Sequence, residues 1–165
     1  MSRFEAFANK LWDYDQYARA RLFEHVCKWY LENDPSYRRQ VRTVWLWNDW
    51  PERWGPDAGI DLVAETRSGE LWAIQSKAYD PAHSVTKSDV DTFLSESARK
   101  QFVYRLLIAT TDNFSRNALR TIQAQEKPVG VLRRTDLERS AVIWPASPKD
   151  LHAIPASAHS DESGH

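Results

Sequence analysis

The sequence contains a single cysteine, Cys27, among its 165 residues. One cysteine cannot form a disulfide framework or a cysteine-based zinc site, and its position in an apolar helical pattern predicts a core residue. This sparing use of cysteine favours a reducing compartment, so we expect a cytoplasmic protein. The start of the sequence lacks an apolar leader, and no run approaches the roughly 18 apolar residues of a membrane span. We therefore expect neither secretion nor membrane insertion.

Several catalytic and metal-binding motifs are also missing from the sequence. There is no glycine-rich phosphate loop and no Gly-x-Ser-x-Gly turn, which argues against nucleotide hydrolysis and serine-hydrolase chemistry. No internal repeat is present. Three histidines near the end, His152, His159 and His165, are spaced too irregularly to indicate a metal site.

The chain has no excess of positive charge, because its net charge is -1. A strong autonomous nucleic-acid binder usually carries a basic excess. The average hides an asymmetry: residues 99–139 hold nine Lys or Arg against four acids, a net +5, whereas residues 1–98 hold 12 against 16, a net -4. A basic segment of this kind suits a phosphate backbone, but ordinary solvated helix faces would give the same count. Both interpretations remain open at this point.

The length predicts one domain with a single sizeable core. We place this domain at residues 1–146. From residue 147 to 165 the composition shifts to Pro, Ala, Ser, His and Asp without an apolar period, which is typical of a linker or disordered tail.

The apolar periodicity predicts helices and strands that alternate along most of the chain. Helices are expected at residues 3–12, 17–32, 89–99 and 115–126, and strands at 41–50, 60–65, 71–78, 104–110 and 129–132. Asp34 and Pro35 are expected to end the second helix, with a strand to follow. This order predicts an α/β protein with a mixed β-sheet flanked by helices.

The two strands 60–65 and 71–78 are expected to form a hairpin, because residues 67–70 carry the Ser-Gly punctuation of a tight turn. Side chains alternate along a strand, so Gln75 and Lys77 should project to the same side. Asp61 stands at the start of the other strand, and an acid, an amide and an ammonium thus converge. Polar groups among apolar residues are costly to bury without partners, and a bound cation would supply one. A solvated hairpin face is the alternative.

These residues resemble the PD-(D/E)xK nuclease superfamily, in the Mrr-like variant in which Gln75 of Gln-Ser-Lys77 stands where the second acid would be. The resemblance covers roughly residues 15–145. The chain is similar to the nuclease domain at the N-terminus of bacterial restriction enzymes of the single-polypeptide type I or type III-like kind. In those enzymes a helicase-like translocase, and often a methyltransferase, follows on the same chain. Further segments match in order: Phe23-Glu24, Val44 to Trp47, Asp91 to Phe93 and Ala109 to Thr111.

The resemblance implies a restriction-endonuclease-like fold and a metal-dependent endonuclease that hydrolyses DNA phosphodiester bonds. Magnesium, or manganese in its place, would be held by the oxygens of Asp61, Glu24 and Gln75, which suit a hard cation. Lys77 would orient the attacking water and help to neutralise the developing charge. Glu24 lies at the edge of the apolar arc of its helix, where it would compensate for the neutral Gln75.

Some alternatives remain open from the sequence. Asp57 of Pro56-Asp57 competes with Asp61 for the role of motif aspartate, although only Asp61 starts an apolar strand. The expected partner is double-stranded DNA, and the candidate contacts in the basic segment are Arg99, Lys100, Arg116 and Arg120. A structure-specific repair nuclease would use the same catalytic residues, and a non-cleaving DNA-binding module of the same fold is a third possibility.

The loop that follows the strand 41–50 is rich in tryptophan, with Trp50 and Trp54 on either side of Arg53. Such rings can stack on bases or ribose, but they more often pack in a core or a lid. We favour packing for these two tryptophans.

Overall fold

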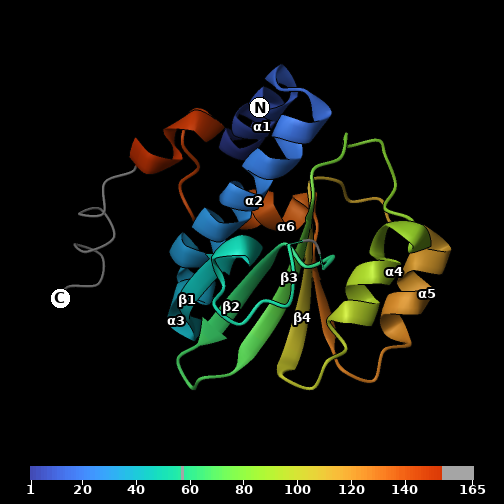
Figure 1. The fold of residues 1–165 in the computed structure, drawn as a ribbon. Helices are drawn as coiled ribbons and strands as arrows, with labels where there is room; N and C mark the ends of the chain where they lie inside the picture. Colours follow the sequence, from blue (N-terminus) through green and yellow to red (C-terminus); the bar gives the residue numbers. More distant parts are fainter. Residues whose placement is uncertain (57, 154–165) are drawn as a thin grey trace.

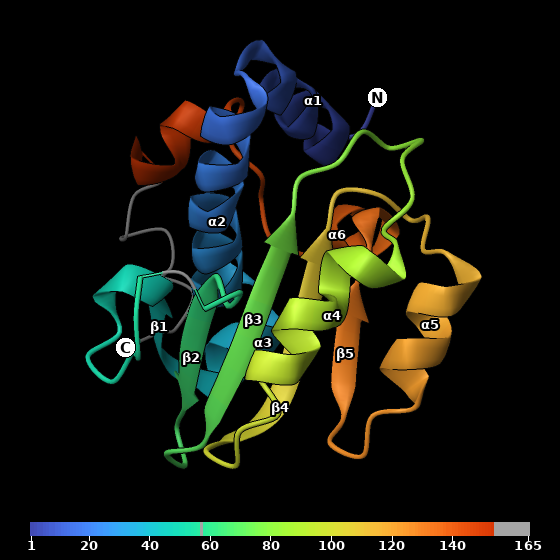
Figure 2. The same ribbon diagram turned by 45° about the vertical axis from the view of Figure 1, so that its right-hand side comes forward.

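The computed structural model describes residues 1–56 and 58–153 and shows a five-stranded sheet with helices on both faces (Figures 1 and 2). The strand order is β1-β2-β3-β4-β5. The first three strands pair antiparallel, and β4 and β5 run parallel to β3. This confirms the predicted α/β class and mixed sheet. The strands are β1 (Val41–Leu46), β2 (Leu62–Thr66), β3 (Leu71–Lys77), β4 (Phe102–Ala109) and β5 (Val129–Leu132).

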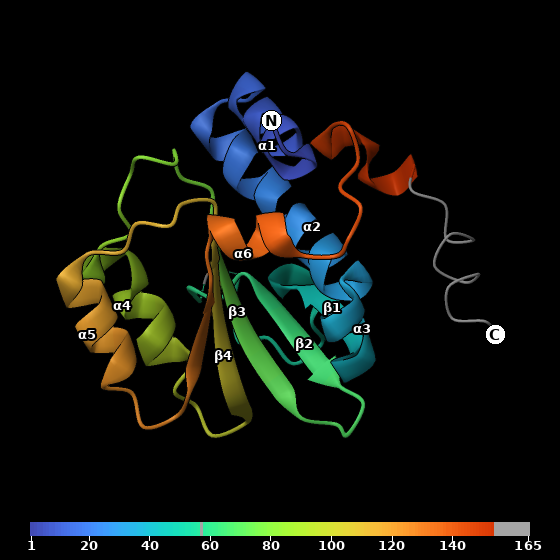
Figure 3. The same ribbon diagram turned by 180° about the vertical axis from the view of Figure 1, so that it is seen from behind.

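The helices divide between the two faces of the sheet. The bounds are α1 (Arg3–Asn9), α2 (Gln16–Asn33), α3 (Pro35–Gln40), α4 (Lys87–Glu96), α5 (Arg116–Gln123) and α6 (Arg134–Arg139), with 3-10 turns η1 (Lys10–Asp13), η2 (Trp47–Asp49) and η3 (Pro148–Ala153). Helices α4 and α5 cover one face, and α2, α3 and α6 lie on the other (Figures 2 and 3). None of the helices within residues 1–56 and 58–153 has the length and apolar character required to cross a membrane.

Apolar side chains from both faces of the sheet form two cores. In β3, Trp72 and Ile74 point to the core under α2, whereas Ala73 joins the core under α4 and α5. This alternation is the period-two geometry of a strand. The central strands are therefore covered on both sides, as predicted, and Cys27 is buried in the α2 core.

The β2-β3 hairpin has the expected turn. The N–H of Gly69 donates to the carbonyl oxygen of Thr66 (3.0 Å), and the N–H of Thr66 donates to that of Glu70 (2.8 Å). Gly69 has φ of 89°, a left-handed conformation that glycine adopts without steric cost. The resulting register pairs Leu62 with Ile74, so Asp61 lies opposite Gln75 at the open end of the hairpin.

Two short helices were not predicted. Asp34 and Pro35 end α2 as expected, but they also start α3: Asp34 Oδ2 accepts from the N–H groups of Ser36 (3.0 Å) and Tyr37 (3.1 Å), and proline is favoured at a first helical position. Helix α6 was missed in the same way. The strand predicted for residues 41–50 ends at Leu46, where η2 begins.

The segment from residue 147, expected to belong to the tail, includes the 3-10 turn η3. Leu151 of this turn is buried in the core under α2. Residues 154–165, including two of the irregularly spaced histidines, lie outside the described residues, so a tail there stays a prediction.

Candidate active site

The candidate site lies at the end of the sheet where β2 begins and β3 ends, beside the first turns of α2 (Figure 2). Helix α2 starts after Asp15, whose carboxylate accepts a hydrogen bond from the N–H of Ala18 (2.8 Å). Its apolar residues pack on β1 and β3, and Glu24 stands at the margin of this buried face. The helix therefore holds the Glu24 carboxyl group near the strand ends at which the site lies.

Glu24 and Asp61 come together although they are far apart in the sequence. Burial, the charge of Asp61 and a hydrogen bond between the two carboxyl groups raise the pKa of Glu24 from 4.5 to about 7, against the opposing effect of Arg21. Two carboxylates in contact disfavour ionisation of both. The pair is therefore suited to share either a proton or a cation.

Asp61 is held firmly by the neighbouring strand. Its Oδ2 accepts hydrogen bonds from the backbone N–H of Ser76 (2.9 Å) and from the Ser76 hydroxyl (3.4 Å). Its own N–H donates to the carbonyl oxygen of Ile74 (2.9 Å), and its carbonyl oxygen accepts from the N–H of Trp47 (2.9 Å). The carboxylate of Asp61 is therefore positioned before any ligand binds.

Gln75 carries an unpartnered oxygen. The side chain is only 6% exposed, and its Nε2 donates to the carbonyl oxygen of Gly59 (3.3 Å), which fixes the amide orientation. Among the described residues, Oε1 has no hydrogen-bond partner. Leaving a buried acceptor unsatisfied costs about 1–3 kcal/mol, and a ligand bound to this oxygen would remove that cost. Gly59, whose carbonyl oxygen accepts the hydrogen bond from Nε2, has φ of 74°, a conformation that favours glycine.

Lys77 ends β3 and lines the same hollow as Asp61 and Gln75. Its ammonium lies close enough to Asp89 to influence it. The pKa of Asp89 is lowered because hydrogen bonds from Thr86 and Tyr79, together with the charge of Lys77, outweigh the opposing effect of burial. Lys77 therefore lies near an acid at the start of α4 and lines a hollow that Glu24 and Asp61 also line.

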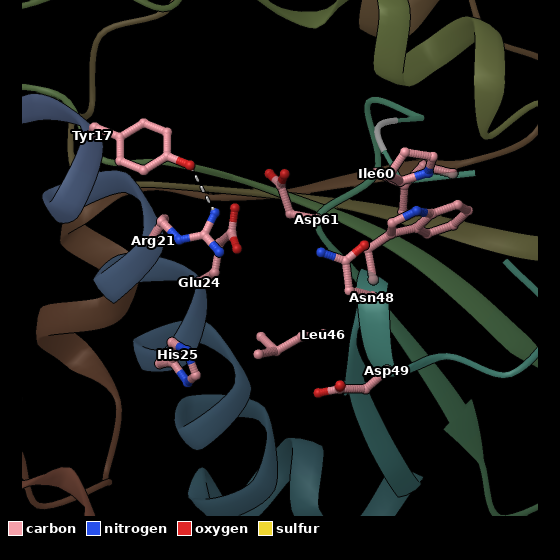
Figure 4. Close-up of a pocket in the computed structure, with 11 residues that line it drawn as sticks. Tyr17, Arg21, Glu24, His25, Leu46, Asn48, Asp49, Ile60 and Asp61 are labelled. Atoms are coloured by element: carbon pink, nitrogen blue, oxygen red, sulfur yellow. Dashed lines mark hydrogen bonds between the residues drawn. The ribbon is translucent and has the colours of Figure 1, made fainter. Parts of the chain in front are cut away.

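Two hollows meet at Glu24 and Asp61, which line both of them. One, of about 550 Å³, also contains Gln75 and Lys77. The other, of about 540 Å³, is shown in Figure 4, where Tyr17, Arg21, Glu24 and His25 of α2 face Asn48, Asp49 and Asp61 across the cavity. The carboxyl pair thus lies where the two hollows adjoin, and we refer to the two hollows together as the groove.

The donor set fits a hard cation. Within the described part of the chain there is no cluster of three or more His, Cys, Asp or Glu residues suited to a metal ion. The set consists instead of the two carboxyl groups of Glu24 and Asp61 with the unpartnered amide oxygen of Gln75. Magnesium binds oxygen ligands and commonly needs only one or two carboxylates, with waters and substrate phosphate completing its shell.

The four basic residues predicted to contact DNA do not line this groove. In the β3-β4 register Leu71 pairs with Phe102, so Arg99 and Lys100 lie at the start of β4, about 20 Å along the sheet from Lys77. Arg99 stacks on the Trp54 ring at 3.6 Å, and Arg116 and Arg120 belong to α5. DNA contact by these residues stays a prediction.

The structure places other basic and aromatic residues at the groove. Arg19 and Arg21 of α2 line its two halves, with Trp12 and Tyr17 beside them. These four residues were not predicted from the sequence, although Tyr17, Arg21 and Glu24 recur at helical spacings of four and three. Trp50 is buried and Trp54 is partly buried against Phe102, in agreement with packing rather than stacking on DNA. Asp57, the alternative motif aspartate, lies outside the described residues.

A family model described as "Restriction endonuclease" (Mrr_cat_2) matches residues 32–153. The chain belongs to this restriction endonuclease family. The resemblance that Asp61, Gln75 and Lys77 indicated is thereby confirmed at the level of the family. Comparison with curated protein sequences gives no match.

Three solved structures of restriction enzymes are similar to this restriction endonuclease domain. The ATP-dependent type ISP restriction-modification enzyme LlaBIII, solved bound to DNA, matches with a TM-score of 0.66 and 33% identity over 81% of the chain. MspJI, in complex with a 27-mer oligonucleotide, matches with a TM-score of 0.61 and 22% identity over 89% of the chain. The modification-dependent enzyme AspBHI matches with a TM-score of 0.56 and 16% identity over 96% of the chain. The likeness to MspJI and AspBHI shows the fold alone. The chain spans only 8%, 33% and 39% of the three proteins.

Proposed function

We propose that this chain is a metal-dependent endonuclease domain that hydrolyses phosphodiester bonds of double-stranded DNA. The observation that carries the proposal is that one hollow is lined by the carboxyl pair of Glu24 and Asp61 and by Gln75, whose buried Oε1 has no hydrogen-bond partner among the described residues. Without a ligand, this arrangement leaves one buried acceptor unsatisfied and keeps two acids close enough to raise the pKa of Glu24 to about 7. Both costs are relieved by a divalent cation.

The residues of the groove take distinct roles in this proposal. Asp61, positioned by Ser76, and Glu24, positioned by α2, would hold the ion together with Gln75. A bound Mg²⁺ or Mn²⁺ would neutralise phosphate charge and favour formation of the attacking hydroxide. Lys77 places an ammonium in the same hollow, where it donates to a phosphate oxygen and orients the attacking water.

Plasmid cleavage tests this function. The wild-type chain with Mg²⁺ or Mn²⁺ should nick supercoiled plasmid, and Asp61→Asn and Lys77→Ala should each abolish nicking. Lys28→Ala is the matched control, because Lys28 pairs with Glu32 on α2 outside the groove and should leave activity unchanged. Nicking by Asp61→Asn and Lys77→Ala at the wild-type rate would reject the proposed site.

We further propose that the domain serves as the cleavage part of a cytoplasmic restriction enzyme with a helicase or translocase, and in some cases a methyltransferase, on the same polypeptide. The likeness to LlaBIII, an ATP-dependent enzyme of which the chain spans 8%, supports this. Sequence choice would then come from other parts of the enzyme, and the domain alone should nick slowly and without sequence preference. Discrete bands from cutting at one fixed sequence, without nucleotide or added subunits, would contradict the proposal.

A further inference from the structure

Exposed aromatic side chains concentrate at the groove. The sequence has eight tryptophans, six tyrosines and six phenylalanines, all within the described residues, and Trp12 and Tyr17 are the two whose side chains are exposed. Tyr17 is 72% exposed and Trp12 36%. Each lines one of the two hollows that meet at Glu24 and Asp61. Exposure of large rings is costly in water, and here it occurs on both sides of the candidate catalytic centre.

Each exposed ring carries an arginine. The Arg19 guanidinium lies 4.5 Å from the centre of the Trp12 ring, and that of Arg21 lies 5.4 Å from the centre of the Tyr17 ring. Arg21 also donates a hydrogen bond to the Tyr17 hydroxyl (3.2 Å), as Figure 4 shows. Stacking restricts a guanidinium to one region of space while leaving its edge available to donate. The rings therefore restrict the two guanidinium groups to positions that line the groove.

Neither arginine has a carboxylate partner among the ion pairs of the described residues. Arg19 donates one hydrogen bond from Nη1 to the carbonyl oxygen of Tyr14 (3.0 Å), and its buried Nε has no partner within the described chain. Arg21 lies close enough to Glu24 to lower its pKa, although burial and Asp61 outweigh this effect. Two guanidinium groups with unused donors thus flank an acidic centre.

We propose that these two pairs, Trp12 with Arg19 and Tyr17 with Arg21, bind the DNA strand at the phosphates on either side of the bond that is cut. The arginines donate to phosphate oxygens, and the ring faces pack on deoxyribose. Guanidinium groups match phosphate geometry better than ammonium groups do, and such contacts fix the register of the strand without reading its sequence. This inference rests on the proposed function, because the pairs are arranged around the same carboxyl centre.

The binding of a fluorescently labelled DNA duplex, measured by anisotropy in EDTA over a range of salt concentrations, tests the inference without any cleavage. Arg19→Gln and Arg21→Gln should each weaken binding about tenfold. Each should also reduce the slope of log K against log salt by about 0.9, because one phosphate contact is lost. Trp12→Ala and Tyr17→Ala should weaken binding with the slope unchanged. Arg19→Lys and Arg21→Lys should restore the slope.

Arg42→Gln is the matched control, because Arg42 is an exposed arginine that pairs with Glu65 (3.3 Å) near the far end of the β1-β2 ladder. Its binding should equal that of the wild type. The thermal midpoint of each variant checks folding, and the exposed Arg21 supplies a decisive variant if Arg19→Gln does not fold.

The possible results separate this inference from the proposed cleavage. Arginine variants that bind with the affinity and salt slope of Arg42→Gln would overturn the inference, even if the wild type cuts plasmid. A wild-type chain that binds no duplex would overturn it as well. Loss of binding in the arginine variants together with a wild type that never cuts in Mg²⁺ or Mn²⁺ would support this surface and reject the proposed nuclease activity.

Discussion

The Oδ2 atom of Asp61 accepts two hydrogen bonds from Ser76, one from the backbone N–H at 2.9 Å and one from the hydroxyl at 3.4 Å. Ser76 lies between Gln75 and Lys77 in β3, so one strand supplies two side chains of the candidate site and also anchors Asp61. The backbone contact has the usual length of an N–H···O hydrogen bond, whereas the hydroxyl contact is close to the limit of a hydrogen bond. The strand itself therefore positions Asp61.

Ser76→Ala is expected to have a small effect for this reason. The variant removes the 3.4 Å contact but retains the 2.9 Å backbone bond. We expect a loss of less than about 1 kcal/mol in the free energy of unfolding and cleavage within about fivefold of the wild-type rate. Urea denaturation and plasmid nicking measure the two quantities. A hundredfold loss of activity in a folded variant would show that the hydroxyl has a chemical role.

Gln75→Glu should lower the metal concentration needed for cleavage, because it adds a third negative charge to the site. The same charge should make the metal-free protein less stable, since Glu24 and Asp61 already disfavour ionisation together. A magnesium titration of nicking, and the thermal midpoint in EDTA, measure the two effects. Gln75→Leu is the paired variant: it removes the unpartnered oxygen and should remove metal-dependent activity while preserving the fold. A Gln75→Leu protein with a normal magnesium titration would exclude Gln75 as a ligand.

The stability of the metal-free protein should fall as the pH rises from about 4.5 to about 7. The pKa of Glu24 is 4.5 in the unfolded reference and about 7 in the folded protein, so the folded state binds this proton more tightly. Stability due to the bound proton is complete below pH 4.5 and is lost as the pH passes through the folded value. Thermal midpoints in EDTA across this range measure the effect.

Glu24→Gln should remove that pH dependence and raise the midpoint in EDTA at pH 8, because the amide carries no charge. Magnesium should stabilise the wild type at pH 8 but not the variant. If the variant and the wild type respond equally to magnesium and to pH, Glu24 neither titrates in this range nor binds the ion.

Arg105→Ala should destabilise the fold away from the groove. The buried guanidinium donates to the carbonyl oxygens of Leu94 (3.0 Å) and Lys127 (2.9 Å) and to the Gln125 side chain (3.0 Å), so it joins the ends of α4 and α5 to β4. Its removal leaves buried acceptors unpaired and a cavity, which costs about 2–4 kcal/mol. Urea denaturation measures the loss. Val103→Ala, at an exposed site of the same strand, is the control, and equal stabilities would contradict this role.

Local patterns in the sequence were sufficient for the hairpin and part of the site. The alternation of β3 placed Gln75 and Lys77 in one hollow, and the Ser-Gly turn brought Asp61 opposite them. Glu24 lies on a helix far from the hairpin in the sequence, so its approach to Asp61 depended on tertiary packing, and it was indicated by its place at the edge of the apolar arc together with the family resemblance. Helices α3 and α6 were missed because six residues give too little apolar period, and their caps decide where they begin.

The position of the basic segment relative to the groove could not be predicted from the sequence, and DNA contact by its residues stays a prediction. A charge count along residues 99–139 does not include strand direction, and Arg99 lies just before β4, at the end of the strand farthest from Lys77. The exposed rings of Trp12 and Tyr17 were missed because composition does not show which aromatic residues stay outside the core. Most of the aromatic residues are wholly or partly buried, so exposure became informative only in three dimensions.

The division of the site between a hairpin and a helix also affects the order of folding. Asp61, Gln75 and Lys77 are joined by one tight turn, whereas Glu24 reaches them only after α3 and β1 are in place. Closing the short loop costs less chain entropy, so we expect the hairpin part of the site to form first. Val63→Ala in β2 should then slow folding more than Phe23→Ala in α2 does, relative to the stability each removes. Stopped-flow folding rates would show the opposite order if α2 docks before the hairpin closes.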